Sequence, residues 1–147
     1  FKEDTRDSYV KSLKSKLEGE RLLAILGKHE QTAFVLGYTG ATKMIQAKHA
    51  FNPFVKLAFF NAGKKQLETA ILKDSQNVEL VFLRYATQVS APGILNYNKH
   101  LVNDRKFILH AKNYKNVDEQ LTNTIRSFMT GQKLTPEEKQ QLLNISK

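Results

Sequence analysis

The sequence contains no cysteine, and this absence narrows the chemistry that the protein can perform. Without a thiol there can be no disulfide bridge, no thiolate metal site and no cysteine nucleophile. An exported protein that needs no bridges can lack cysteine just as a cytosolic protein can, so this absence alone leaves the compartment open.

Other scarcities concern the fold. Only three prolines and seven glycines occur among the 147 residues, which leaves room for long helices. No apolar run approaches the roughly 20 residues that cross a bilayer, so we expect no transmembrane segment. Hydrophobic residues at 41% and charged residues at 25% are close to the values of folded proteins. With no linker or low-complexity stretch in between, residues 1–147 are predicted to form a single domain.

Negative charge is also scarce. The chain has 14 acidic residues against 23 Lys and Arg, a net charge of +9, which predicts attraction to nucleic acid, acidic proteins or membrane surfaces. Only five of the 23 are Arg, the residue that provides most bidentate phosphate and base recognition. Dispersed lysines more often solvate the outer faces of helices, so we favour that interpretation over a nucleic-acid site.

The residues that are present indicate helices throughout. Asn52-Pro53 is a helix start, Asn77 can cap another, and Thr135 with Glu138 forms a capping-box pattern. Each predicted connection has residues that start or end helices, and none has the turn residues typical of a β-hairpin. The predicted fold is therefore all-α, with about six to eight helices. We expect helices over residues 9–26 (with a break near Ser15 that could split it in two), 31–49, 53–73, 78–89, 98–109 and 117–129, and a last one after residue 135.

The apolar pattern predicts how these helices pack. Ala33, Gly37 and Ala41 form a stripe of small residues that would let another helix approach closely. The segment 78–89 is apolar nearly all round and is expected to be buried, with a strand as its main alternative. The inner face of helix 53–73 is predicted to consist of Phe60, Gly63, Leu67, Ala70 and Ile71. Most of the nearby phenylalanines are expected in the core, with one or two lining a pocket: Phe51, Phe54, Phe59 and Phe60.

Predicted helix 53–73 carries Gly63, Leu67 and Ala70 on one face and ends at a short polar turn that Asp74 opens, and the helix before it carries Leu36-Gly37. This arrangement resembles a tetratricopeptide-type repeat, in which two antiparallel helices are joined by a short polar turn. The three residues of helix 53–73 stand at the offsets of the repeat's second helix, and Leu36-Gly37 resembles the Leu-Gly pair of a first helix. The pattern departs from the repeat at Ser75, where proline is usual, and at Arg84, where an apolar residue is usual. The resemblance implies tetratricopeptide-like helix pairs of divergent form.

The segment from His49 to Tyr97 contains a second set of residues that together resemble a known family. They are His49-Ala50-Phe51-Asn52-Pro53, Glu79-Leu80, Phe82-Leu83-Arg84, Ala91-Pro92, Leu95 and Tyr97. In these residues the segment resembles a family of uncharacterised exported helical proteins of Bacteroidetes. The resemblance implies export to the periplasm or cell envelope after removal of a leader, which agrees with a chain that begins at Phe1, and a tetratricopeptide-like fold. It implies no activity.

Arg84 is the most informative polar residue, because it lies within the most apolar predicted helix. A buried guanidinium needs a partner, and the favoured interpretation is an ion pair with a carboxylate. The functional alternative is an anion-binding group at the bottom of a helical groove. The candidate partners are Asp104, Glu79 and Asp74.

Four other residues complete the candidate ligand-binding set with Arg84: Tyr97, His100, Asp104 and His49. His100 and Asp104 stand one helical turn apart and could form an orienting dyad, although a plain surface pair is favoured. His49 ends a predicted helix, where capping is its default role.

Catalytic and metal-binding signals are otherwise absent from the sequence. The histidines form no His-Glu-x-x-His pair, and the chain carries neither a nucleophile elbow nor a phosphate-binding glycine loop. We therefore expect no enzyme, no metal and no cofactor, with a cryptic enzyme using Arg84, His100 and Asp104 as the remote alternative.

The predicted function is a non-catalytic, helical-repeat-like module that binds a protein or peptide in a groove between helix pairs. The alternative is a basic protein that binds a polyanion, either nucleic acid or a membrane surface. The oligomeric state stays open.

Overall fold

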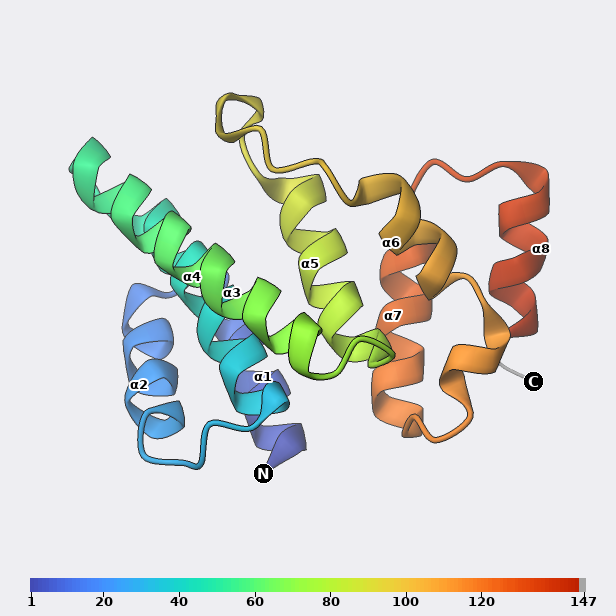
Figure 1. The fold of residues 1–147 in the computed structure, drawn as a ribbon, viewed down its shortest axis with the longest axis horizontal. Helices are drawn as coiled ribbons and strands as arrows, with labels where there is room; N and C mark the ends of the chain where they lie inside the picture. Colours follow the sequence, from blue (N-terminus) through green and yellow to red (C-terminus); the bar gives the residue numbers. More distant parts are fainter. Residues whose placement is uncertain (146–147) are drawn as a thin grey trace. The chain divides into compact units, whose positions relative to one another are not determined.

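The computed structural model describes residues 1–145, and over this range it confirms the all-α prediction (Figure 1). These residues contain eight α-helices, two short 3-10 helices and no strand, so the strand alternative for residues 78–89 is wrong. The α-helices are α1 (Lys2–Ser12), α2 (Lys16–Leu26), α3 (Ala33–His49), α4 (Pro53–Lys73), α5 (Val78–Ser90), α6 (Leu101–Ile108), α7 (Glu119–Thr130) and α8 (Pro136–Asn144). The 3-10 helices are η1 (Gly93–Leu95) and η2 (Ala111–Tyr114).

The caps inferred from the sequence form where they were expected. Asn52 accepts hydrogen bonds from the backbone N–H groups of Phe54 and Val55 and starts α4. Thr135 and Glu138 form the reciprocal capping box at the start of α8. Ser15 caps α2, so the proposed break near this residue divides the first predicted helix into α1 and α2. Local side-chain chemistry therefore sets these helix ends.

The chain forms two compact units, Phe1–Ser75 (unit 1) and the part that begins at Gln76 (unit 2). The structure fixes the packing within each unit. One domain over residues 1–147 stays a prediction.

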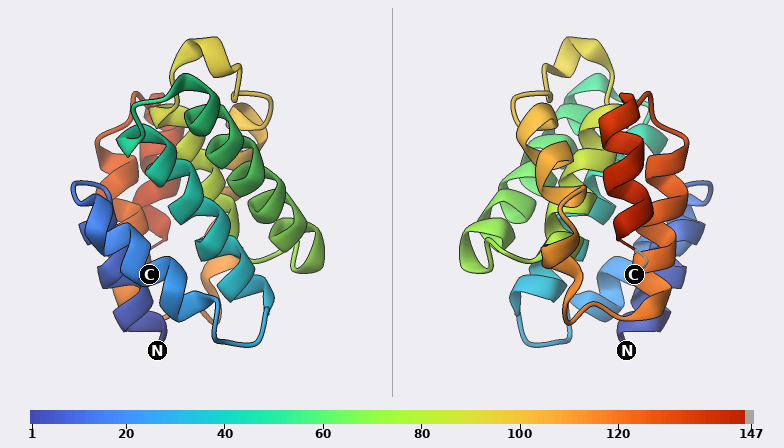
Figure 2. Two further views of the ribbon diagram at one scale, coloured as in Figure 1. Left: turned by 90° about the vertical axis from the view of Figure 1, so that its left-hand side faces the viewer. Right: turned by 90° about the vertical axis from the view of Figure 1, so that its right-hand side faces the viewer.

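In unit 1, α3 packs against α1 and α2 and also against α4, which runs beside it (Figures 1 and 2). The two long helices meet at Gly40 and Gly63. A Cβ atom on Gly40 would lie 2.5 Å from the carbonyl oxygen of Gly63 and 2.6 Å from the backbone nitrogen of Leu67. α3 and α4 therefore approach closely at Gly40, a residue that the predicted small-residue stripe did not include. A close approach at Ala33, Gly37 and Ala41 stays a prediction.

The buried face of α4 matches the prediction residue for residue. Its buried side is formed by Phe60, Gly63, Leu67, Ala70 and Ile71.

The phenylalanine prediction is wrong for three of its four residues. Phe60 is buried, but Phe51, Phe54 and Phe59 are exposed, with Phe51 99% and Phe54 83% accessible. No residue from Phe51 to Phe59 is buried, and the buried face of α4 begins at Phe60. Composition alone suggested core positions for all four phenylalanines, but burial depends on the tertiary packing around each one.

Unit 2 has its own hydrophobic core, to which α5, α6, α7 and α8 all contribute. As predicted for its apolar sequence, α5 is buried along most of its length. On α7, Leu121, Ile125 and Met129 recur at intervals of four residues and form one buried stripe. Arg105 of α6 binds Glu138 of α8 at 2.9 Å, which adds a polar contact between these two helices.

Candidate functional site

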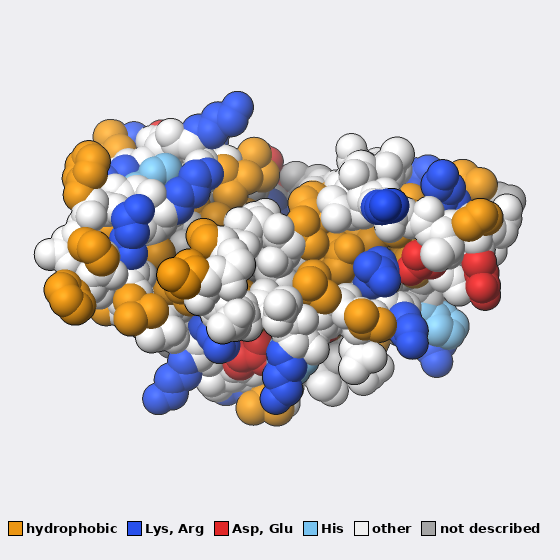
Figure 3. All heavy atoms as spheres, turned by 90° about the horizontal axis from the view of Figure 1, so that it is seen from above, with side chains coloured by type: hydrophobic (Ala, Val, Ile, Leu, Met, Phe, Trp, Pro, Cys, Tyr) orange, Lys and Arg blue, Asp and Glu red, His pale blue; other side chains and the backbone are white. Residues whose placement is uncertain are grey.

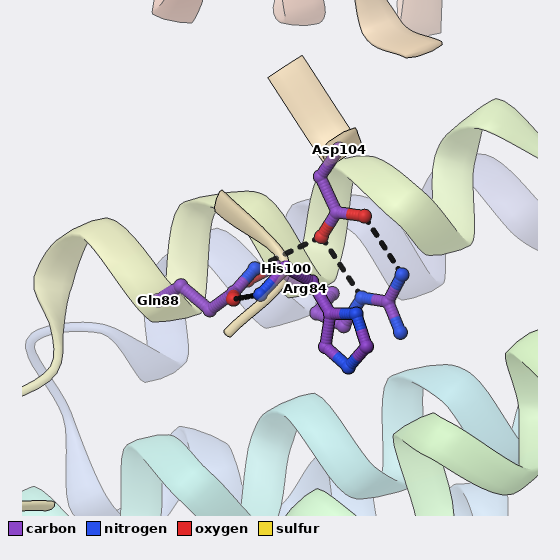
Figure 4. A network of polar contacts seen from close by, with 4 residues as sticks. All are labelled: Arg84, Gln88, His100 and Asp104. Carbon is purple, nitrogen blue, oxygen red and sulfur yellow. Dashed lines mark hydrogen bonds and ion pairs between the residues drawn. The ribbon is translucent and has the colours of Figure 1, made fainter. Parts of the chain in front are cut away.

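Arg84 takes part in a buried polar network of unit 2 (Figure 4). Its Nε donates to Oδ2 of Asp104 at 2.8 Å and its Nη2 donates to Oδ1 at 2.7 Å, a bidentate ion pair between α5 and α6. The side chains are 11% and 3% exposed, so the pair is almost fully removed from water. The favoured interpretation of Arg84, an ion pair with a carboxylate, is therefore confirmed with Asp104 as a partner.

Gln88 completes the network, and sequence reasoning missed it. Its Nε2 donates to Oδ2 of Asp104 at 2.9 Å, and its Oε1 accepts the backbone N–H of His100 at 2.8 Å. Gln88 therefore joins the ion pair to the start of α6, whose N-cap is His100. A signal was available, because Gln88 stands one helical turn after Arg84 in an otherwise apolar segment.

The favoured interpretation of His100 and Asp104 as a surface pair is wrong, because the side chain of Asp104 is only 3% exposed. The carboxylate of Asp104 accepts from Arg84 and Gln88, while the Asp104 backbone N–H donates to the His100 carbonyl at 2.8 Å. The two residues thus meet through the helical backbone. Their arrangement positions α6 on α5 and gives the guanidinium a structural task.

The other two members of the predicted set, Tyr97 and His49, belong to different units. Tyr97 is buried in unit 2, in the segment that leads into α6. His49 belongs to unit 1, where its Nε2 donates to the carbonyl of Ser12 at 3.1 Å. Lys48 donates to the carbonyl of Leu13 at 3.2 Å, so two basic residues at the end of α3 cap the end of α1. A ligand role for the five residues stays a prediction.

A small open pocket of about 240 Å³ lies in unit 2. None of the five predicted residues lines it. The side chains around it come from α6, the segment after it, and α8: Lys106, Leu109, His110, Ala111, Gln141 and Asn144.

The most distinctive surface of the molecule lies at the start of α4. We call residues Phe51–Phe59 the aromatic tip. Its large apolar side chains are all exposed: Phe51, Phe54, Val55, Leu57 and Phe59. Figure 3 shows hydrophobic and basic side chains gathered at this end of unit 1. Large contiguous exposed apolar patches are uncommon on monomeric proteins and usually mark an interaction surface.

The tip lies within a long stretch that carries no negative side chain. From Gln31 to Leu67 the chain has five lysines and not one Asp or Glu. Lys48 and Lys56 are exposed beside or within the tip. The lysines are dispersed along the chain, and the local imbalance arises because acidic residues are missing from this stretch, a signal that was not used in predicting the site. An anionic surface would therefore meet no negative side chain of α3 or of α4 before Glu68.

Comparisons of the chain with protein-family models, curated proteins and solved structures gave no match.

Residues 1–145 hold no group of three or more acidic, histidine or cysteine side chains able to bind a metal. None of the helices in this range is long and apolar enough to cross a membrane.

Proposed function

We propose that the protein is a non-catalytic binding module that holds an anionic partner against the aromatic tip of unit 1. The observation that carries this proposal is the exposed apolar tip set in a stretch with five lysines and no acidic residue. Apolar contacts would supply affinity, and the lysines would attract and orient the partner.

The engagement of Arg84 supports a non-catalytic role. Its guanidinium makes two short hydrogen bonds to one buried carboxylate, a contact that holds α5 on α6. Arg84 and Asp104, two of the three residues of the enzyme hypothesis, thus have a structural role in this pair. We also propose that the module works outside the cytoplasm, as the Bacteroidetes resemblance implies.

The test compares retention of the full chain on two anionic probes, immobilised heparin and phosphatidylglycerol vesicles, at low and high salt. We expect retention on at least one probe at low salt and its loss at high salt, because screening weakens contacts between exposed charges. Lys56→Glu should reduce retention more than Lys73→Glu, which makes the same charge change at the far end of α4. If neither probe retains the chain at low salt, the proposal is wrong.

A second candidate is the tetratricopeptide-like peptide module. It is favoured by the packing of α4 on α3 through Gly63, with Leu67 and Ala70 buried at the offsets of the repeat. Binding in a peptide groove would depend less on salt than binding to a polyanion. Binding to a helical peptide that persists at high salt and is unchanged by Lys56→Glu would favour this candidate.

A further inference from the structure

The apolar residues of the aromatic tip do not lie on one narrow face. At about 100° per residue, Phe54, Val55, Leu57 and Phe59 spread over about 200° of the helix circumference. Lys56 falls within the remaining arc, and Phe51 precedes the helix with its ring 99% exposed. A helix segment that is apolar over more than half its circumference suits an environment that surrounds it.

This distribution favours a lipid layer over a protein groove as the occupant. A groove binds a helix along one stripe of residues at positions i, i+3, i+4 and i+7, and it would leave part of the tip's apolar arc in water. The boundary between lipid headgroups and acyl chains can contact a protruding segment from several sides. Aromatic side chains and lysines on a helix are typical of proteins that lie in this boundary layer.

The backbone of the tip is also prepared for removal from water. Pro53 has no N–H, Asn52 Oδ1 accepts from Phe54 and Val55, and the N–H of Lys56 donates to the Asn52 carbonyl at 3.0 Å. The donors of the first helical turn, which are normally left to water, are therefore satisfied within the chain. Satisfied backbone groups lower the cost of entering an apolar layer.

Charge decides which kind of lipid fits. Lys48 and Lys56 lie at the level of the tip or next to it, and no acidic residue occurs between Gln31 and Leu67. Basic residues beside an inserted segment attract anionic headgroups, and lysine can keep its ammonium among the headgroups while its stem lies deeper.

We propose that the aromatic tip inserts into the interfacial layer of a bilayer that contains anionic lipids. Phe51 and Phe54 enter below the headgroups, and Lys48 and Lys56 contact lipid phosphates. This inference rests on the proposed function and names the partner of the same surface. The protein is then held on the membrane face by its tip, without a spanning helix.

The natural absence of tryptophan provides a clean reporter. Phe54→Trp places a single indole on the tip. Leu72→Trp places one at the opposite end of α4, at a site that is 84% exposed and thus matched to the 83% of Phe54. With phosphatidylglycerol vesicles, we expect the emission of Phe54→Trp to shift to the blue and to be quenched by brominated acyl chains. The emission of Leu72→Trp should not change.

A partition measurement tests the affinity. Phe51→Ser and Phe54→Ser should each lower vesicle binding by about tenfold, because each removes an apolar ring from the interface. Leu72→Ser should leave binding unchanged. Circular dichroism should show an intact fold for all three variants, since the substituted side chains are exposed. Neutral phosphatidylcholine vesicles should bind the chain at least tenfold more weakly than anionic ones.

The following outcomes would each overturn the inference. Retention on heparin without vesicle binding would overturn the lipid assignment and leave the proposed function standing. No retention on either probe would contradict both the lipid assignment and the proposed function. Vesicle binding that shifts both indoles equally, or survives both Phe→Ser substitutions, would place the contact elsewhere. Shielding of the Phe54→Trp indole by an acidic helical peptide but not by vesicles would identify a protein occupant.

Discussion

The ion pair between Arg84 and Asp104 makes a strong prediction about stability. Asp104→Ala removes the two hydrogen bonds that Asp104 accepts from the guanidinium and the one from Gln88, and it takes a negative charge away from a guanidinium whose side chain is only 11% exposed. Breaking one side of such a buried pair costs about 3–5 kcal/mol. Domains of ordinary size are stable by only about 5–15 kcal/mol, so unit 2 should lose a large share of its stability.

The matched control replaces both partners. Arg84→Met with Asp104→Leu removes the two charges together and fills the space with apolar atoms. Desolvation of an ion pair offsets much of its attraction, so this double variant should be about as stable as the natural chain or more stable by about 1–4 kcal/mol. The single variants should both be much less stable than the double variant.

Urea denaturation followed by circular dichroism measures the free energy of unfolding, and amide hydrogen exchange assigns the loss to α5 and α6. The reasoning is refuted if Asp104→Ala changes the stability by less than about 1 kcal/mol, the size of an ordinary surface effect. It is also refuted if the double variant loses as much as Asp104→Ala, because the pair would then contribute net stability of its own.

Two further predictions concern other contacts. Gly40→Ala should destabilise unit 1 by about 3 kcal/mol or more in thermal unfolding, because its Cβ would meet the backbone of Gly63 at 2.5 Å. The control is Gly93→Ala, which has open space around it and should change stability by less than about 1 kcal/mol. The hydrogen bond from the backbone N–H of Thr135 lowers the pKa of Glu138 below its ordinary value, and the positive charge of Arg105 lowers it further. A lowered folded-state pKa favours folding above the ordinary value of about 4.3 and loses that contribution as pH falls through the folded-state pKa. The free energy of unfolding should therefore fall as the pH is lowered into the acid range, and Glu138→Gln should make this fall smaller. If Glu138→Gln left the pH dependence of stability in acid unchanged, Glu138 would not be its cause.

The helix ends could be predicted because their causes are local. The Asn52-Pro53 start and the Thr135 capping box depend on residues within one turn of each other, and both form as expected. The buried face of α4 was predictable for the same reason, since helical periodicity decides which residues share a side.

The candidate site was less predictable, because burial and pairing depend on distant segments. Three carboxylates could have paired with Arg84, and only the packing of α6 on α5 selects Asp104, 20 residues away. The exposure of Phe51 and Phe54 likewise depends on which helices pass over the start of α4. The wide apolar arc and the missing acidic residues were visible in the sequence, but phenylalanine composition suggested a core.

The contact between Gly40 and Gly63 also fixes a length. It prevents α4 from sliding along α3, so the segment from Pro53 to Gly63, with its ten rises of about 1.5 Å, acts as a rigid arm of about 15 Å between the packed crossing and the first residue of the helix. Adding one helical turn to this arm would lengthen it by about 5.4 Å and leave the crossing untouched. The glycine pair therefore sets the distance between the packed crossing of α3 and α4 and any partner that binds the phenylalanines of the aromatic tip.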